Sequence, residues 1–288
     1  MKYSFITQHK NTWSISLQCK VLGVKRSGYY AFLKRKEDYV HLDMLEWVKN
    51  IARSSDYTYG SRRIKKVLNA LSFPVSRNKT RKLMKEANIR VRRRRKYKVT
   101  TNSNHKLPLF DNLVKREFDV NQPNQVYVGD ITYIWTQEGW LYLAVVIDLY
   151  SRKVVGWSMS SRMKATMVCD ALTMAIWQRQ PNKGLIHHSD RGSQYASKDF
   201  RRLVKIHGIK GSMSRKGDCW DNAVVESFFG TLKQERVHWQ NYQTRYEAQQ
   251  DILQYISMFY NSERIHSYLD YMSPNDYEKQ QLELDKVA

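Results

Sequence analysis

Cysteine is scarce in this sequence, and its placement argues against two kinds of small stabilised fold. The 288 residues include three cysteines, Cys19, Cys169 and Cys219, which are far apart in the chain. No two of them have the close spacing that zinc ribbons and disulfide-rich scaffolds use. The sequence therefore disfavours both architectures and favours a protein of a reducing compartment.

Long apolar stretches are lacking as well. The longest apolar run among the central segments is "LYLAVVI", far below the roughly 20 residues of a transmembrane helix. The first residues, "MKYSFITQHKNTW", contain no apolar core of a secretory signal. Because 42% of the residues are hydrophobic, there is still ample material for a buried core. We expect a folded cytoplasmic protein with no membrane partner.

Acidic residues are few in the first part of the chain, and this makes the charge strongly asymmetric. The formal net charge is +22. Residues 1–120 carry 29 basic and 9 acidic side chains, a net charge of +20, whereas residues 121–288 carry 20 and 18, a net charge of +2. A basic segment joined to a near-neutral body is typical of a polyanion-binding module attached to another domain. We expect nucleic acid as the partner.

The basic part contains two candidate helical DNA-binding units. Residues 14–36 show two short helical patterns around a glycine, which resembles a helix-turn-helix. Residues 60–88 contain two basic helical patterns around the turn "SFPVS", and Ser76 is a plausible N-cap of the second. The run "RVRRRRKYK" follows and could track a phosphate backbone. The cations that we expect to bind DNA phosphates here are Arg62, Arg63, Lys65, Arg92, Arg93, Arg94 and Arg95.

From about Gln125 onward the composition changes to that of a sheet with helices. "QVYVGDITYIW", "GWLYLAVVIDLY" and "KVVGWSMS" are rich in Val, Ile, Tyr and Trp, which predicts a three-stranded antiparallel meander. The segments after Met163 alternate helix, strand, helix, strand and helix, and Gly208 is expected to close the second of these helices. The order predicts a mixed α/β sheet with helices on its faces.

Three acids stand where a folded core would not need them. Asp130 interrupts the first strand, Asp190 ends the strand "LIHHSD", and Glu226 sits in the helix "NAVVESFFGTLKQE". Separately, each has an ordinary explanation: a satisfied structural acid, the start of a turn, and a solvated side chain. Together, three unpaired acids on separate elements fit a site for hard divalent cations, which take oxygen ligands.

The helix that carries Glu226 has one apolar stripe, formed by Val225, Phe228, Phe229 and Leu232. Glu226 lies beside this stripe, and Lys233 is displaced from Glu226 by only about 20° around the helix axis. We therefore expect a glutamate and a lysine at one boundary between core and solvent.

Several neighbouring polar residues compete for a role. Asp148 is explained by hydrogen bonds to turn amides, and Asp221 makes a good N-cap near Asp218. In an alternating strand, one of His187 and His188 would be buried and the other would face the site, where His188 could position substrate. Gly192 could allow close backbone or DNA approach, or it could simply serve the turn.

Three motifs carry a resemblance to a known family. "GDITYIWTQEGWLYLAVVIDLYSRKVVGW", "HHSDRGSQY" and "WDNAVVESFFGTLKQE" are similar to the catalytic core of bacterial insertion-sequence transposases related to retroviral integrases. The resemblance implies a ribonuclease-H-like fold and a DDE triad of Asp130, Asp190 and Glu226. The 35 residues between Asp190 and Glu226, and a basic residue seven after the glutamate, here Lys233, match that superfamily. The resemblance implies that Lys233 binds DNA on the same helix edge as Glu226. The similarity extends to "YTYGSRRIKKVL" and "FYNSERIHSYLDYMSPNDY", and so covers most of the chain.

The resemblance also implies a domain layout, an activity and partners. A basic helical DNA-binding region (1–98) and a linker (99–120) would precede an integrase-like catalytic core with C-terminal helices (121–288). The chain would cleave insertion-sequence ends and join the 3′-hydroxyl to DNA, using two Mg²⁺ ions, with Mn²⁺ able to substitute. Expected partners are the terminal repeats, target DNA, further copies of the chain in a homo-oligomer, and an upstream-frame helix-turn-helix protein. The bacterial protein would be associated with the nucleoid.

Other functions remain compatible with these residues. A related nuclease would cut without joining, and only a joined product separates it from a transposase. A DNA-binding protein that no longer catalyses would keep the basic region without using the acids. A ribosomal or chromatin accessory protein would use the basic arm alone and would leave the three acids unexplained.

Overall fold

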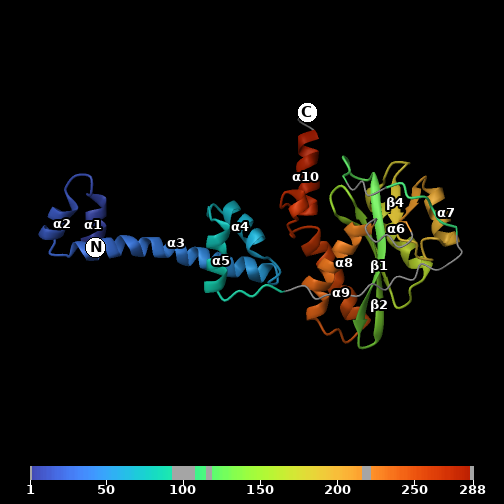
Figure 1. The fold of residues 1–288 in the computed structure, drawn as a ribbon, viewed down its shortest axis with the longest axis horizontal. Coiled ribbons are helices and arrows are strands. Elements are labelled where there is room, and N and C mark those ends of the chain that lie inside the picture. The colour runs from blue at the N-terminus through green and yellow to red at the C-terminus, as the bar shows by residue number, and fades with distance from the viewer. Residues whose placement is uncertain (1, 93–107, 115–118, 216–221, 286–288) are drawn as a thin grey trace. The chain divides into compact units, whose positions relative to one another are not determined.

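The computed structural model describes residues 2–92, 108–114, 119–215 and 222–285. The chain divides into two compact units, Met1–Val91 and Arg92–Ala288. We call them the helical unit and the sheet unit, and each is described by itself (Figure 1). In the described parts of the chain, no helix combines the length and the apolar character that a membrane span requires.

Among the described residues of the helical unit, the regular secondary structure consists of α-helices joined by turns and loops. The expected pair of short helices in residues 14–36 is only half correct, because the helix after Gly23 continues for 29 residues. The sequence contains no signal that would end this helix earlier, since residues 29–54 include neither glycine nor proline. The helices are α1 (Lys2–Gln8), α2 (Ile15–Val21), α3 (Arg26–Ser54), α4 (Ser61–Ala70) and α5 (Arg77–Glu86).

Helices α4 and α5 form the compact basic pair that the sequence predicts. The Ser76 hydroxyl accepts a hydrogen bond from the backbone N–H of Lys79, which confirms Ser76 as the N-cap of α5. Ile64 and Leu68 of α4 are buried, as are Leu83 and Met84 of α5. Apolar burial on the inner faces leaves the basic side chains of both helices on the outside.

The sheet unit contains a five-stranded mixed sheet. Its strand order is β3-β2-β1-β4-β5, in which β1, β2 and β3 are antiparallel neighbours and β4 and β5 run parallel to β1. The predicted meander and mixed sheet are therefore confirmed, and this arrangement is ribonuclease-H-like. The strands are β1 (Val126–Thr136), β2 (Gly139–Asp148), β3 (Val154–Ser160), β4 (Ile186–Ser189) and β5 (Lys210–Met213).

Helices cover both faces of this sheet (Figure 1). One face packs against α6 (Ala165–Arg179) and α7 (Lys198–Ile206), in a core that includes Tyr127 and Val146. The other packs against α8 (Ala223–Glu235), α9 (Arg245–Gln254) and the π-helix Tyr255–Tyr260. Gly208, with φ of +64°, ends α7 as expected. The sheet is thus the middle layer of three.

The C-terminal segment is tied to the sheet unit by polar contacts as well as by apolar ones. The Asn261 side chain accepts a hydrogen bond from the Val154 N–H and donates one to the Val154 carbonyl, at 3.0 and 2.9 Å. Glu278 of α10 (Pro274–Asp285) accepts two hydrogen bonds from the Arg179 guanidinium. Both interactions fix the last helices against elements that lie 107 and 99 residues earlier in the chain.

Candidate active site

Two aspartates emerge where neighbouring parallel strands separate. The pairing of β1 with β4 runs from Val126↔Ile186 to Gly129↔Ser189 and ends there. The next residue of each strand is an acid, Asp130 on β1 and Asp190 after β4. The carboxyl edge of parallel strands is where open α/β sheets place their ligands. The register therefore brings these two acids to one point of the sheet.

The surroundings of Asp130 show which charges lie near it. Burial raises the pKa of its carboxyl well above the usual value, and the nearby Asp190 and Glu226 carboxylates raise it further. A hydrogen bond from the Ile131 N–H and the positive charge of Lys233 act in the opposite direction. The two aspartates, the glutamate and the lysine thus form one electrostatic cluster.

Helix α8 holds Glu226 as its apolar pattern predicts. Val225, Phe228, Phe229 and Leu232 are all buried in the core beside β1 and β2. Glu226 is half-buried at the border of this stripe, and burial raises the pKa of its carboxyl. Glu226 is therefore not the fully solvated side chain that its ordinary explanation assumed.

Asn222 occupies the N-cap position of α8. Its side-chain amide is buried and donates to the carbonyl of Gly129, at 3.4 Å, instead of capping its own helix. The first turn of α8 is therefore attached to the strand residue that precedes Asp130. Asp218 and Asp221 lie outside the described residues.

Lys233 lies seven residues after Glu226, on the same helix. Its ammonium is 4.6 Å from the centre of the Tyr133 ring, a cation–π contact that joins α8 to β1. Burial lowers the pKa of Lys233, and the charge of Asp130 partly offsets this effect. The lysine is thus positioned beside the acids, with an aromatic ring under its charge.

The described side chains do not form a complete set of metal ligands. Among the described residues, no group of three or more His, Cys, Asp or Glu side chains is arranged to hold a metal ion. Asp130 accepts a hydrogen bond from the Ile131 N–H at 2.7 Å, and Asp190 accepts one from the Gly192 N–H at 2.9 Å. The contact of Gly192 with Asp190 is a turn contact, which favours the turn explanation for this glycine.

The two histidines before Asp190 are both buried, whereas the alternation of the strand predicted only one buried histidine. His188 hydrogen-bonds through Nδ1 to the Ser212 hydroxyl of β5, at 2.8 Å. Neither ring nitrogen of His187 has a hydrogen-bond partner among the described residues, and burial lowers its pKa to about 3. His187 instead packs near Tyr195 and Phe200. β4 is only four residues long and lies in a sheet with helices on both faces, so side chains that point to either face are buried.

Asp148 is structural, as its place at a turn predicts. Its carboxylate accepts hydrogen bonds from the backbone N–H groups of Asn124 and Tyr150, at 2.9 and 3.0 Å. Arg179 lies 3.5 Å away. Burial raises the pKa of Asp148 to about 6, and those partners counteract the increase.

The predicted DNA-binding cations differ in their surroundings. On α4, Arg62 is exposed, Arg63 lies 5.2 Å from the centre of the Tyr59 ring, and Lys65 is half-buried. Arg92 belongs to the sheet unit, where its guanidinium donates to the Glu235 carbonyl at 3.0 Å and lies over Trp239. Arg93, Arg94 and Arg95 are outside the described residues.

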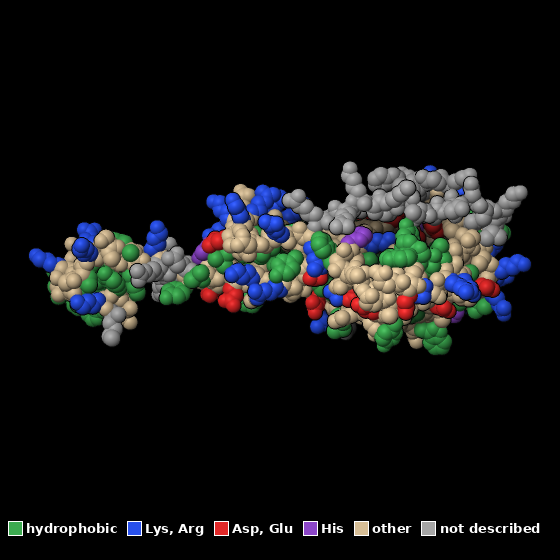
Figure 2. Space-filling view, turned by 90° about the horizontal axis from the view of Figure 1, so that it is seen from below, with side chains coloured by type: hydrophobic (Ala, Val, Ile, Leu, Met, Phe, Trp, Pro, Cys, Tyr) green, Lys and Arg blue, Asp and Glu red, His purple; other side chains and the backbone are tan. Residues whose placement is uncertain are grey.

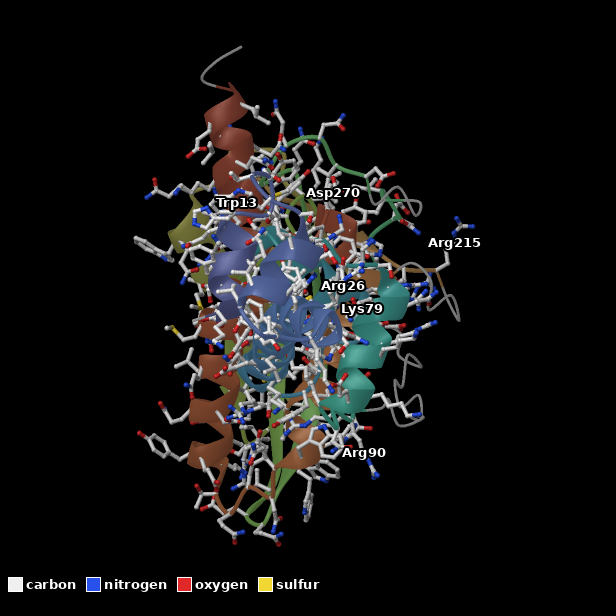
Figure 3. All side chains as sticks on the ribbon, turned by 90° about the vertical axis from the view of Figure 1, so that its left-hand side faces the viewer. Trp13, Arg26, Lys79, Arg90, Arg215 and Asp270 are labelled. Carbon is white, nitrogen blue, oxygen red and sulfur yellow. The ribbon has the colours of Figure 1, made fainter. Side chains whose placement is uncertain are left out.

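Helix α5 carries a set of exposed cations that the sequence reasoning did not single out. They alternate with the buried Thr80, Leu83 and Met84, and this helical spacing was the signal that could have identified them. Lys79, labelled in Figure 3, is one of the set. The exposed cations of α5 are Arg77, Lys79, Arg81, Lys82 and Lys85.

Two arginines beside the acids were also missed. Arg191 follows Asp190 directly, and its Nε donates to the Ser214 carbonyl at 2.7 Å, which links the β4 and β5 ends. Arg215 follows at the end of β5 and is exposed, with its side chain extending away from the ribbon (Figure 3). Both lie in loops at the edge where Asp190 is placed.

Comparison with known families agrees with this architecture. The family described as "Integrase core domain" matches residues 120–219 and, through a second family of the same description, residues 226–282. The family described as "HTH-like domain" matches residues 41–97, which contain α4 and α5. The helix-turn-helix match therefore falls on the second of the two expected units and not on residues 14–36.

Similar proteins cover nearly the whole chain. The transposase InsF for insertion sequence IS3A of Escherichia coli (strain K12) is 41% identical over 98% of this chain and 100% of its own length. The insertion element IS600 uncharacterized 31 kDa protein of Shigella sonnei is 44% identical over 89% of this chain and 95% of its own. The solved HTLV-2 integrase catalytic core domain in complex with magnesium aligns with a TM-score of 0.42, at 18% identity, over 54% of this chain and 96% of that one. By its similarity to InsF over almost its full length, this chain belongs to the insertion-sequence transposases of the IS3 family, which carry an integrase core domain.

Proposed function

We propose that Asp130, Asp190 and Glu226 form the catalytic triad of a metal-dependent DNA transposase that cleaves insertion-sequence ends and joins them to target DNA. The observation that carries the proposal is the register of β1 and β4, whose pairing stops one residue before Asp130 and Asp190. The charge of Glu226 on α8 reaches the same point, since it contributes to the raised pKa of Asp130. Carboxylates from three separate elements thus share one negative site.

A hard divalent cation fits the chemistry of this set. All three side chains offer oxygen ligands, and burial with mutual repulsion raises the pKa of Asp130, so a bound cation would relieve the repulsion. Mg²⁺ usually uses one or two protein carboxylates together with water and substrate phosphate oxygens. The lack of a closed three-ligand cage among the described residues therefore agrees with a site that substrate completes. When bound, one or two such ions would activate the attacking oxygen and stabilise the leaving oxygen of a phosphodiester.

The joining step of the proposed reaction leaves the number of phosphodiester bonds unchanged. Hydrolysis at an element end breaks one P–O bond and frees a 3′-hydroxyl. That hydroxyl then attacks a second phosphodiester, so one P–O bond forms as another breaks and no nucleotide cofactor is needed. In both steps Asp130, Asp190 and Glu226 would hold the divalent cation that the phosphate approaches, and Lys233 would neutralise a neighbouring phosphate charge.

The helical unit supplies DNA affinity in this proposal. The exposed face of α4 and α5 presents Arg62 and the cations of α5, and the HTH-like family match covers both helices. Phosphate contacts of this kind position DNA without reading its sequence. Because two element ends must be joined, we further propose that the DNA complex contains more than one copy of the chain. An upstream-frame helix-turn-helix protein would add to the recognition of the ends.

A cleavage and joining assay with Mg²⁺ tests the proposal. The substrate carries the genomic ends that flank the gene, and the wild-type chain is compared with Asp190→Asn and Glu226→Gln. Each substitution should lower product formation by about a hundredfold or more, while the affinity for DNA changes less than about twofold. Asp199→Asn, an exposed acid in the first turn of α7, is the matched control and should retain activity.

The products also separate the alternatives. Joined product that depends on Asp190 supports the transposase, and cleaved product without joining would identify a nuclease. Full joining by Glu226→Gln would refute the triad. If DNA binds but no product forms, the assay is repeated with the fused upstream reading frame, and continued inactivity would point to a DNA-binding protein without catalysis.

A further inference from the structure

The end of the β1–β2 hairpin carries an exposed pair of tryptophans that the catalytic proposal does not use. Trp135 and Trp140 are directly opposite each other across the hairpin, with side chains 54% and 43% exposed. Their rings meet edge to face at 4.9 Å between centroids, and Trp140 makes a similar contact with Tyr133 at 5.0 Å. Large aromatic side chains normally bury most of their surface, so this pair calls for an explanation.

The pair is exposed because the sheet ends before it on both sides. Pairing of β1 with β4 stops at Gly129, and pairing of β2 with β3 reaches only Tyr142↔Ser160. Beyond these points, none of the other described strands pairs with the two strands of the hairpin. Helix α6, which covers this face of the sheet farther along, begins at Ala165 after β3 has ended. The tryptophans therefore form an uncovered platform on the α6 side.

The platform is held rigidly from behind. The Gln137 N–H at the hairpin turn donates to the Tyr242 carbonyl, at 3.0 Å. Arg245, the first residue of α9, donates to the carbonyls of Trp140 and Glu138, at 3.0 and 2.7 Å. A surface fixed before its partner arrives loses little conformational entropy on binding.

The platform lies farther along the strand that carries the first acid. Trp135 is five residues after Asp130 on β1, a distance of about 17 Å at 3.3–3.4 Å per residue. Successive phosphates of one DNA strand are about 3.4 Å apart along the axis, so this span corresponds to roughly five stacked nucleotides.

Tyr133 connects the acids with the platform. By the alternation of β1 it shares the face of Trp135, whereas Asp130 belongs to the face that packs against α8. The ammonium of Lys233 on α8 nevertheless lies 4.6 Å from the centre of the Tyr133 ring. Beyond Gly129, β4 no longer pairs with β1, so within the described part of the chain no strand separates the two faces at this edge of β1.

Cations accompany the aromatic rings. Arg162 and Lys164 are exposed in the turn after Ser160, the residue paired with Tyr142 two positions from Trp140. Seen from below, the sheet unit shows hydrophobic side chains at its surface, with both basic and acidic side chains between them (Figure 2). Aromatic faces next to positive charge are the features with which proteins hold single-stranded nucleic acid. An apolar protein partner would gain nothing from these cations.

We infer that Trp135 and Trp140 form a stacking platform for unpaired bases of the DNA strand that leads away from the active site. This inference rests on the proposed function and specifies its substrate, a DNA end that is locally single-stranded beside the cleaved phosphate. Tyr133 and Lys233 bridge the acids to the platform, and Arg162 and Lys164 accompany the phosphates. The cross-strand tryptophan pair thus serves binding in addition to any contribution to the hairpin.

Binding of two DNA probes tests the platform. One probe is a duplex of the element end with a single-stranded overhang of about five nucleotides, and the other is the blunt duplex. All variants carry Asp190→Asn, which prevents turnover, so the result does not depend on catalysis. Trp135→Ala or Trp140→Ala should weaken overhang binding by roughly fivefold or more and leave blunt-duplex binding within about twofold. Trp135→Phe should retain most of the affinity, and Trp177→Ala, which removes another exposed tryptophan of this unit, should change neither probe.

A fluorescent base gives a second measurement that stability alone would not affect. 2-Aminopurine in the overhang should be quenched on binding to the parent protein and to Trp135→Phe, but not to Trp135→Leu, which keeps an apolar side chain without an aromatic face. Equal loss of affinity for both probes, or quenching by Trp135→Leu equal to that of the parent, would overturn the inference. If the chain with an intact triad cleaves no DNA, alone or with the fused upstream reading frame, while the quenching is intact, the proposed function is refuted and the platform is not.

Discussion

The imidazole of His187 lies so close to the α-carbon of Gly129 that a β-carbon added at residue 129 would stand 2.8 Å from its Nε2. The two residues lie on the adjacent parallel strands β1 and β4, directly behind Asp130. The hydroxyl of Tyr195 would also be 3.3 Å from such a β-carbon. The wall behind the acids therefore leaves room for glycine and for no larger residue at 129.

Gly129→Ala should lower the free energy of unfolding by about 1–3 kcal/mol, because the buried imidazole cannot move aside without disturbing Tyr195 and Phe200. Urea denaturation of the variant and the wild type measures the loss. The same substitution made in a His187→Ala background should cost less, because the crowding atom is gone. If the effects of the two substitutions on the free energy of unfolding were additive, the contact between residue 129 and His187 would not be the cause of the destabilisation.

The buried His187 should make stability depend on pH. Its pKa in the folded protein is about 3, below the usual value of about 6.5, so the unfolded chain binds the proton more readily between these limits. Stability is therefore fully present above pH 6.5 and is lost as the pH falls, by about 1.4 kcal/mol per unit. His187→Phe should remove this loss.

The measurement is the difference in unfolding free energy between wild type and His187→Phe, taken from about pH 7.5 down to about pH 5. Burial raises the pKa of Asp148 to about 6, which makes stability fall as pH rises through that window, but this effect is present in both proteins and cancels. A constant difference across the range would mean that His187 titrates normally in the folded chain.

Arg264 and Glu235 form a buried ion pair whose disruption should be costly. Two guanidinium nitrogens of Arg264 donate to the carboxylate oxygens of Glu235, each at 2.8 Å, and the Tyr255 hydroxyl donates to the same carboxylate. Arg264→Met should destabilise the protein by about 3–5 kcal/mol because it leaves a buried charge unpaired. The double variant Glu235→Gln/Arg264→Met should be more stable than Arg264→Met alone in thermal or urea unfolding. A double variant less stable than the single one would contradict this explanation.

The exposed cations of α5 should govern the salt dependence of DNA binding. Each phosphate that the protein no longer neutralises reduces the slope of log affinity against log salt concentration by about one. Arg81→Gln/Lys82→Gln should therefore reduce the slope by about two and weaken binding to all sequences alike. Lys183→Gln, an exposed cation just before β4 and at the other end of that strand from Asp190, should leave the slope unchanged. Titrations at several salt concentrations provide the slopes.

Local patterns predicted much of the fold. The apolar stripe of α8, the N-cap at Ser76 and the three antiparallel strands depend on neighbours within a few residues, and the structure has all of them. The length of α3 was misjudged, since the helix after Gly23 was expected to be short and continues to Ser54. Intrinsic propensity is a weak guide when tertiary packing can extend a helix.

Long-range pairings could not be seen in the sequence. His188 is buried because its hydrogen-bond partner, Ser212, is 24 residues away on β5. Asn222 reaches Gly129, 93 residues earlier, and so is held by a strand and not by its own helix. The meeting of Asp130 with Asp190 likewise depends on the register of β1 and β4, which no local pattern specifies. The sequence identified the three acids as candidates, but only the sheet register showed that Asp130 and Asp190 lie close together.

Helices α8 and α9 complete the apolar layer on one face of the sheet, and this bears on how the protein can be divided into fragments. The integrase core match is interrupted between residues 219 and 226, which would suggest a convenient boundary for expression. A fragment ending there would expose Val128, Leu143 and Val145 to water, since their buried neighbours include Val225, Phe228 and Ile252. Such a contiguous apolar face promotes aggregation. The smallest piece of the sheet unit worth purifying is therefore one that keeps the last helices covalently attached.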